Sequence, residues 1–179
     1  MKRGAVLLGS LLLLPALGAG CGTSTKTVTA IQPRNAPVFR DLKAADVTQP
    51  FVDRGYDLVE SHDQSRRLWN CRQKRADNIR VFVHVTGSAP DRIEEIHAAF
   101  MHFGQANREE EARDFFAQVA RAVCHGRQAA DLADWIREKT GGADTAHADS
   151  LEFRVNSLKN AFNFYIRPDP EKPGIKQVK

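Results

Sequence analysis

The chain has 179 residues and a formal net charge of +4 at pH 7, from 26 Lys and Arg residues against 22 Asp and Glu residues. A chain of this length suits a single globular domain rather than several. So small an excess of basic residues gives no argument for binding to nucleic acid, and we expect no nucleic-acid partner.

The first 20 residues have the segment order of a secretory signal peptide. A cationic start, MKR, precedes an apolar run over 5–14, and Pro15 is followed by mostly small residues. As a helix, residues 5–17 would rise only about 20 Å. That is less than the roughly 30 Å of a hydrocarbon core, so cleavage is favoured over a membrane-spanning anchor. Cleavage would lower the net charge from +4 to +2.

The junction LGAGC, residues 17–21, resembles the lipobox of bacterial envelope lipoproteins. In that family the signal peptidase cuts before the cysteine, which is then acylated with palmitate or similar chains. The resemblance implies that Cys21 is lipidated and anchors the protein in a membrane. Gly22, in place of Asp, favours the outer membrane over the inner one. Gly18 stands where the family has a large aliphatic residue, so release as a soluble periplasmic or secreted protein is the alternative.

Two segments are predicted to be flexible. Residues 21–50 contain three prolines and little periodicity, which indicates a tether between the anchor and the domain. Phe39 and Leu42 are candidates to dock on that domain. The tail 169–179 holds two prolines and a glycine and is predicted to be disordered. A single domain is therefore expected over residues 51–168.

Four strands are predicted in the first part of the domain, over residues 56–60, 67–73, 79–85 and 92–103. The clearest is 79–85, where β-branched residues alternate with others. Residues 92–103 fit two structures, because Ile93, Ile96 and Phe100 have helical spacing. A bulge at Glu94-Glu95 would instead produce a strand, and the preceding turn favours this strand in a hairpin.

Two helices and a hairpin are predicted to follow. Asn107 and Glu110 resemble a capping box, and an apolar stripe from Ala112 to Val123 predicts the first helix. The second helix is expected at 128–140, and a β-hairpin at 151–166. The order β-β-β-β-α-α-β-β predicts an α+β fold, with an antiparallel sheet of about five strands and two helices packed on one face.

Cysteine usage suggests a covalent crosslink. If Cys21 is acylated, Cys71 and Cys124 remain, and an even pair in an oxidising compartment favours a disulfide. Closing a loop of this length would contribute roughly 4 kcal/mol in the chain-entropy model. The alternative is two buried thiols, which are common in protein cores.

No catalytic, metal or cofactor site is predicted. His97 and His102 would face opposite sides of a strand, so they do not converge on one metal ion. His62, Asp63 and Ser65 supply the residue types of a catalytic triad, but they sit together in a polar turn without a nucleophile elbow. An enzyme is therefore the less favoured class.

A cluster of basic residues is the remaining candidate site. Arg67 and Arg72 lie on one predicted strand, Arg66 directly precedes it, and Arg80 lies on the next strand. Arginine side chains on a sheet face suit contacts with anionic envelope polymers or lipid phosphates. The alternative is an edge strand protected by charge. We interpret the protein as a non-catalytic, lipid-anchored envelope module that binds a protein or an anionic envelope component.

A second class of function stays open from the sequence. It is a small secreted enzyme or ligand-binding protein with a pocket between the helices and the sheet. A pocket lined by His84, His97 or Tyr165 would favour this reading, and a filled core would count against it.

Overall fold

The computed structural model describes residues 38–169, apart from Gln64, Asp77, Gln105, Ala106, His125, Asp149 and the side chain of Arg127. The predicted signal peptide, the lipidation of Cys21 and the tail beyond Asp169 lie outside the described residues. Within the described part, no helix combines the length and apolar character needed to cross a membrane.

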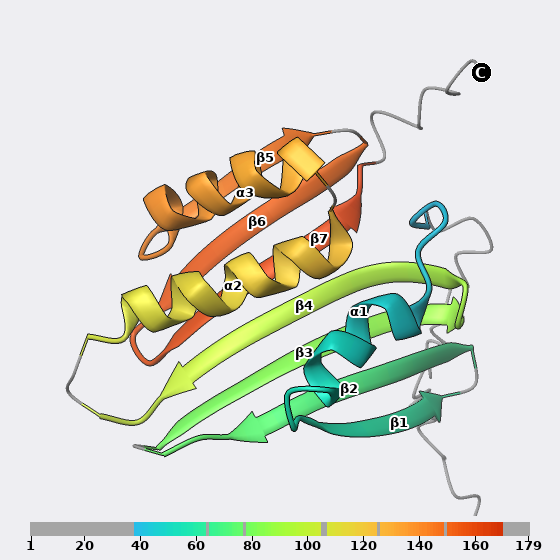
Figure 1. The fold of residues 1–179 in the computed structure, drawn as a ribbon, viewed down its shortest axis with the longest axis horizontal. Coiled ribbons are helices and arrows are strands. Elements are labelled where there is room, and N and C mark those ends of the chain that lie inside the picture. Colours follow the sequence, from blue (N-terminus) through green and yellow to red (C-terminus); the bar gives the residue numbers. More distant parts are fainter. Residues whose placement is uncertain are drawn as a thin grey trace, which may run out of the picture. The chain divides into compact units, whose positions relative to one another are not determined.

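Seven antiparallel strands form one sheet in the order β1-β2-β3-β4-β7-β6-β5 (Figure 1). The strand β7 comes last in the chain but pairs with β4, so it joins the two halves of the sequence in one sheet. The strands are β1 (Asp57–Asp63), β2 (Arg66–Lys74), β3 (Ile79–Ala89), β4 (Arg92–His102), β5 (Ala143–Ala148), β6 (Leu151–Leu158) and β7 (Ala161–Pro168).

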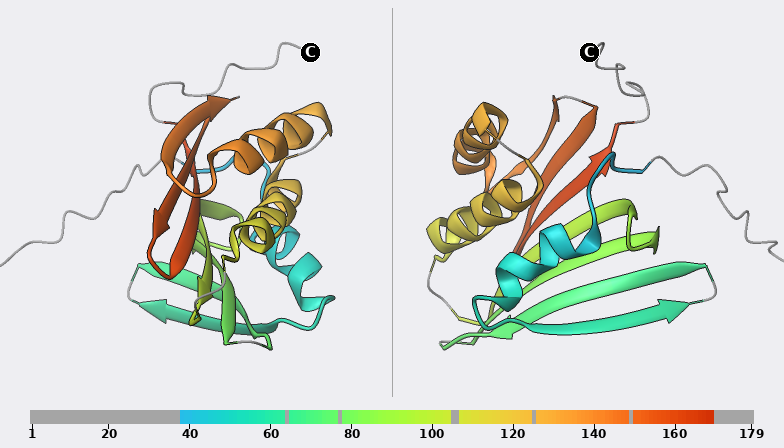
Figure 2. Two further views of the ribbon diagram at one scale, coloured as in Figure 1. Left: turned by 90° about the vertical axis from the view of Figure 1, so that its left-hand side faces the viewer. Right: turned by 45° about the vertical axis from the view of Figure 1, so that its right-hand side comes forward.

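Three helices lie on the same side of this sheet, as the edge-on view in Figure 2 shows. We call the opposite side the helix-free face. The helices are α1 (Ala44–Val52), α2 (Glu109–Val123) and α3 (Gly126–Lys139). In α2, the apolar residues recur at helical spacing and all face inward, which is why this helix packs along the sheet.

The core fills the space between the helices and the sheet. Every second residue of β3 from Ile79 to Val85 points to the helices and is at most 4% exposed. Phe116 of α2 meets Phe164 of β7 with ring centroids 5.5 Å apart. Burying one such phenylalanine contributes roughly 1.5–3 kcal/mol, so the helix-covered face supplies most of the stabilising burial.

Residues 92–102 form the strand β4, which confirms the strand predicted at residues 92–103. A β-bulge within β4 explains why its apolar residues do not simply alternate. Glu95 pairs with Thr86, and the next pair is Ile93 with Gly87, which leaves Glu94 as an extra residue. The bulge lets two isoleucines three positions apart both face the helices. A Cβ at Gly87 would lie 2.2 Å from a backbone oxygen of β4, so the close approach requires glycine.

The prediction of about five strands and two helices is wrong, because the structure has seven strands and three helices. The additional helix α1 begins within the segment predicted as a tether, and its Val47 and Phe51 are fully buried. Phe39 and Leu42 dock as expected, at 5% and 8% exposure. The additional strand β5 is a mostly exposed edge strand of sequence ADTAHA, which lacks the alternating β-branched residues that mark a strand.

Candidate binding surface on the helix-free face

A row of polar and aromatic side chains crosses the middle of the helix-free face. Alternation along each strand aims one residue per strand into this row. The pairing registers place its members next to one another on β2, β3, β4, β7 and β6. In that order they are Asn70, His84, His97, Tyr165 and Arg154.

Two further rows lie to one side of the first. The nearer contains Arg72, Phe82, Ala99, Asn163 and Asn156, and the one beyond it contains Lys74, Arg80, Met101, Ala161 and Leu158. We call these three rows the central rows. On these five strands they hold four cationic residues and no acidic residue. The cations are Arg72, Lys74, Arg80 and Arg154. Acidic residues border the central rows, because Asp57 of β1 stands opposite Arg72, and the row on the other side of the first contains Glu95, Arg167 and Glu152.

The middle of the central rows is an aromatic–histidine cluster formed by Phe82, His84, His97 and Tyr165. Phe82 stacks on His84 and His97 stacks on Tyr165, each pair with ring centroids 4.3 Å apart. The two histidines meet edge to face, with centroids 5.8 Å apart and an interplanar angle of 81°. All four side chains are half-buried. The ring contacts between them hold the cluster in place.

Burial sets the charge state of both histidines. It lowers the pKa of His84 to about 4, and the neighbouring His97 adds to this shift. Burial also lowers the pKa of His97. The hydrogen bond with Asn163 and the nearby Glu95 carboxylate both raise this pKa, but burial has the larger effect. Both imidazoles are therefore neutral at pH 7. The fixed positive charge of this face comes from Arg and Lys.

The structure divides the four predicted arginines between the two faces. Arg66, Arg72 and Arg80 share the helix-free face, while Arg67 points to the opposite side. Arg66 pairs with Glu94, with Nε 3.5 Å from Oε2. Arg80 lies over the ring of Phe103, with its Cζ 5.4 Å from the ring centroid, which is a cation–π contact. Arg72 and Arg80 belong to the central rows, and Arg66 and Arg67 do not.

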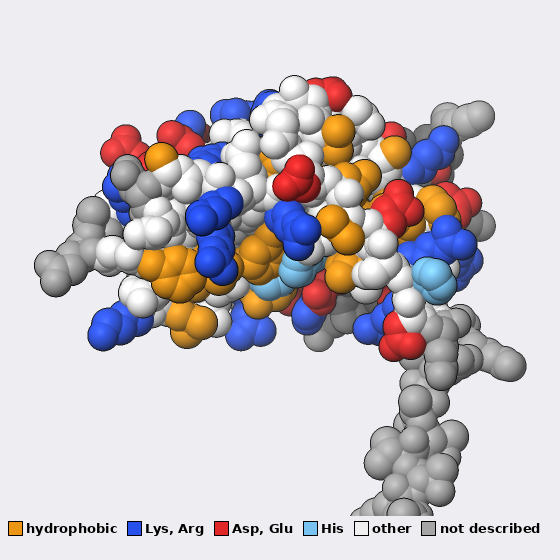
Figure 3. All heavy atoms as spheres, turned by 90° about the horizontal axis from the view of Figure 1, so that it is seen from below, with side chains coloured by type: hydrophobic (Ala, Val, Ile, Leu, Met, Phe, Trp, Pro, Cys, Tyr) orange, Lys and Arg blue, Asp and Glu red, His pale blue; other side chains and the backbone are white. Residues whose placement is uncertain are grey.

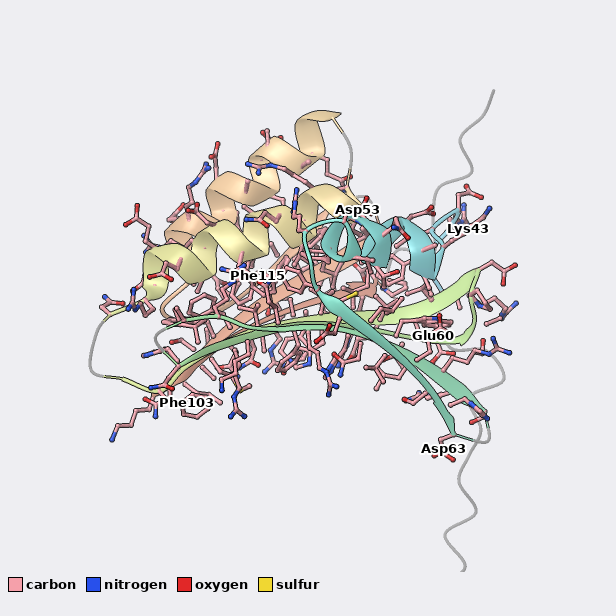
Figure 4. The ribbon with its side chains drawn as sticks, turned by 60° about the horizontal axis from the view of Figure 1, so that its bottom comes forward. Lys43, Asp53, Glu60, Asp63, Phe103 and Phe115 are labelled. Carbon is pink, nitrogen blue, oxygen red and sulfur yellow. The ribbon has the colours of Figure 1, made fainter. Side chains whose placement is uncertain are left out.

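Figure 3 shows hydrophobic side chains, histidine and basic side chains side by side in the view from below. In Figure 4, Phe115 lies between α2 and the sheet, whereas Phe103 lies on the side away from the helices. Phe103 and Leu158 are 52% and 59% exposed, so apolar surface continues along this side. The two sides of one sheet thus present different chemistry.

Sequence reasoning missed Arg154 as a member of the site. It lies on β6, more than 70 residues after the basic cluster, and joins the row only through the pairing of β6 with β7 and of β7 with β4. Its alternation with Phe153 and Val155 was visible in the sequence. What the sequence does not show is which strand lies beside β7, so the two basic regions could not be combined.

The three residues named for a pocket between the helices and the sheet do not lie there. His84, His97 and Tyr165 all point to the helix-free face, and core side chains fill the space beneath the helices. His102 does face the helices, where it is buried and stacks on Phe162 at 5.8 Å. Across the described residues, no group of three or more His, Cys, Asp or Glu side chains gathers in a metal-binding arrangement.

The polar turn between β1 and β2 borders a separate cleft of about 410 Å³. His62, Asp63 and Ser65 line it together with Arg66 and Arg67. Figure 4 shows Asp63 at the far tip of β1. The cleft is a feature of the sheet end, and its turn residues do not assemble a hydrogen-bonded triad within the described part of the chain.

Cys71 and Cys124 carry separate thiols in place of the predicted disulfide. The Sγ atom of Cys71 lies 3.7 Å from the backbone oxygen of Thr48 in α1, so the helix absent from the sequence prediction covers this thiol. Burial raises the pKa of Cys71 to about 11. Cys124 is buried at the end of α2. Cys71 is therefore an inert core residue rather than a nucleophile.

Comparisons with protein-family models, with curated proteins and with solved structures find no match to this chain.

Proposed function

We propose that this chain is an exported, lipid-anchored protein of the bacterial cell envelope whose helix-free face binds an extended anionic polymer. The apolar N-terminal run and the LGAGC junction support export and acylation of Cys21. The observation that carries the binding proposal is the charge of the central rows, where four cations stand on β2, β3 and β6 with Asp57 of β1 as the acidic residue at their edge. Guanidinium groups bind carboxylates and phosphates in paired hydrogen bonds.

The spacing of the cations favours a polymer over a small anion. Arg72 on β2 and Arg154 on β6 are separated by four interstrand steps. At about 4.8 Å per step, this places the two strand positions roughly 19 Å apart. One carboxylate or phosphate group cannot contact both side chains, whereas a chain with repeating charges can. The tight ring stacks between them provide a surface rather than a pocket for that chain.

Two of the acidic residues at the margin of the face are paired with arginines. Glu95 forms an ion pair with Arg167, and Glu94 pairs with Arg66. Their negative charges are thereby offset locally and repel an approaching polyanion less. Arg72 and Arg154 are exposed and form no such ion pair among the described residues, although Asp57 stands opposite Arg72 and Glu152 shares the face of Arg154. We therefore expect these two arginines to supply the contacts.

A sedimentation assay with purified peptidoglycan sacculi, which carry repeating carboxylates, tests the binding proposal. The double variant Arg72→Glu, Arg154→Glu should bind at least tenfold more weakly than the wild-type mature chain. The matched control is Arg121→Glu, Arg137→Glu, which makes the same charge change at exposed positions of α2 and α3. Equal loss in both double variants, or binding to an envelope protein with no binding to sacculi, would contradict the proposal.

The anchoring part of the proposal is tested by the intact mass of the protein from its native host. We expect a mass for residues 21–179 plus acyl chains. An unmodified mass, or one that includes the first 20 residues, would overturn the anchor while leaving the binding assay interpretable.

A further inference from the structure

His84 and His97 form a cross-strand pair at the centre of the helix-free face. They occupy directly opposed positions on β3 and β4, and their ring centroids are 5.8 Å apart. Phe82 stacks on His84 and also meets His97 edge to face, and Tyr165 stacks on His97. Because stacking covers the ring faces, the ring edges, which carry the nitrogen atoms, are the parts left to meet a ligand.

A hydrogen bond fixes the ring of His97 in a form suited to metal binding. Its Nε2 atom lies 3.1 Å from Oδ1 of Asn163. An amide oxygen only accepts hydrogen bonds, so Nε2 donates and the lone pair resides on Nδ1. Histidine ligands of metals are commonly oriented in this way by a carbonyl oxygen on the second nitrogen.

Two further observations concern His84 and its neighbour. Asn70 stands directly opposite His84 on β2, and its Oδ1 atom is buried without a hydrogen-bond partner. A buried acceptor that lacks a partner is costly unless a ligand or ion satisfies it. Among the described residues, no hydrogen bond engages the ring nitrogens of His84. Three donor atoms therefore stand in adjacent positions of one row.

We propose that His84 and His97 bind a borderline divalent cation such as Zn²⁺ or Cu²⁺, with Oδ1 of Asn70 as a third donor. Imidazole suits Zn²⁺, Cu²⁺ and Ni²⁺, whereas Ca²⁺ and Mg²⁺ require several oxygen ligands. Two ring centroids 5.8 Å apart are close enough for one nitrogen of each ring to reach a single ion at the usual metal–nitrogen distance of about 2.0–2.1 Å. Both rings are neutral at pH 7, so the ion does not compete with a bound proton there.

The metal site would add a second binding function to the helix-free face. It does not depend on the proposed binding of an anionic polymer. The remaining coordination positions of the ion point to solvent, on the same surface as Arg72 and Arg154. A carboxylate or phosphate oxygen of a bound polymer is a suitable ligand at those positions. If the two bind together, each raises the affinity of the other by the same factor.

The test is a calorimetric titration of ZnCl₂ into the mature chain, with no polymer present. We expect binding that is weakened at least tenfold by His84→Ala and by His97→Ala. The control His62→Ala removes an exposed histidine at the sheet end and should leave the affinity unchanged. Circular dichroism of each variant separates loss of the site from loss of the fold.

A second measurement identifies the ligands directly. The electron paramagnetic resonance spectrum of the Cu²⁺-loaded wild-type chain should show coupling to two imidazole nitrogens, and each single variant should show one. Unchanged Zn²⁺ affinity in both variants, or a Cu²⁺ spectrum insensitive to them, would overturn the metal proposal. Neither result bears on whether the face binds sacculi, so failure of the two proposals is distinguishable.

Discussion

The two faces of the sheet are built from the same strands but perform different tasks. The helix-covered face packs side chains such as Phe164 and Val83 at zero exposure against α1 and α2. The helix-free face carries half-buried rings and exposed cations, none of which is required to fill a core. Because strand residues alternate between the faces, each strand combines one set of positions for stability with another that is available for binding.

The comparison predicts that a truncation on the helix-covered face has the largest effect. Phe164→Ala removes a fully buried ring that packs on Phe116, and we expect a loss of about 3–5 kcal/mol in the free energy of unfolding. Leu158→Ala, at a position 59% exposed on the helix-free face, should change it by no more than about 0.5 kcal/mol. Urea denaturation measures both, and similar losses would break the distinction between the faces.

An intermediate effect is expected from acid. Burial lowers the pKa of His84 to about 4, so the unfolded chain takes up a proton before the folded chain does. Stability should therefore fall as the pH decreases from about 6.5 to about 4, by roughly 1–2 kcal/mol after allowance for solvent screening.

Urea denaturation across this pH range, with EDTA present to remove metal ions, measures the effect. His84→Gln cannot titrate, so its free energy of unfolding should depend less steeply on pH than that of the wild type. Equal pH dependence in the two proteins would show that carboxylates account for all of the acid effect.

The smallest effect on stability is expected from charge reversal on the helix-free face. Arg72→Glu and Arg154→Glu alter exposed side chains that fill no core, so each should change the free energy of unfolding by at most about 0.5 kcal/mol. Thermal denaturation followed by circular dichroism measures this. Losses of several kcal/mol would mean that these arginines hold the fold together, and the binding assay could not then be interpreted.

Local patterns predicted the elements whose sequences have strong periodicity. The stripe of α2 and the alternation in β3 were visible, and the bulge at Glu94 was the condition under which residues 92–103 form a strand. The helix α1 was missed although Val47 and Phe51 have helical spacing, because the three prolines of residues 21–50 were interpreted as marks of a flexible tether. One of them, Pro50, lies inside the helix, where proline removes a backbone hydrogen bond. Tertiary packing against β2 and β3 outweighs that cost.

The candidate site was less predictable, because it depends on pairing between distant strands. The sequence identified Arg72 and Arg80 but not their proximity to Arg154. It also could not place His84 opposite His97, because one residue more or less in the bulge would change the register of the hairpin. The contact of Cys71 with α1 was likewise not visible in the sequence, where a disulfide with Cys124 was expected and the structure has two thiols.

The central claim is that the helix-free face, and not the helical side, contacts the anionic polymer. Chemical modification of arginines in the mature chain, read by mass spectrometry with and without bound sacculi, tests it most directly. The account predicts that Arg72, Arg80 and Arg154 become protected while Arg121 and Arg137 on the helices react at an unchanged rate. Protection of the helical arginines instead, or equal reactivity at all five positions, would contradict it.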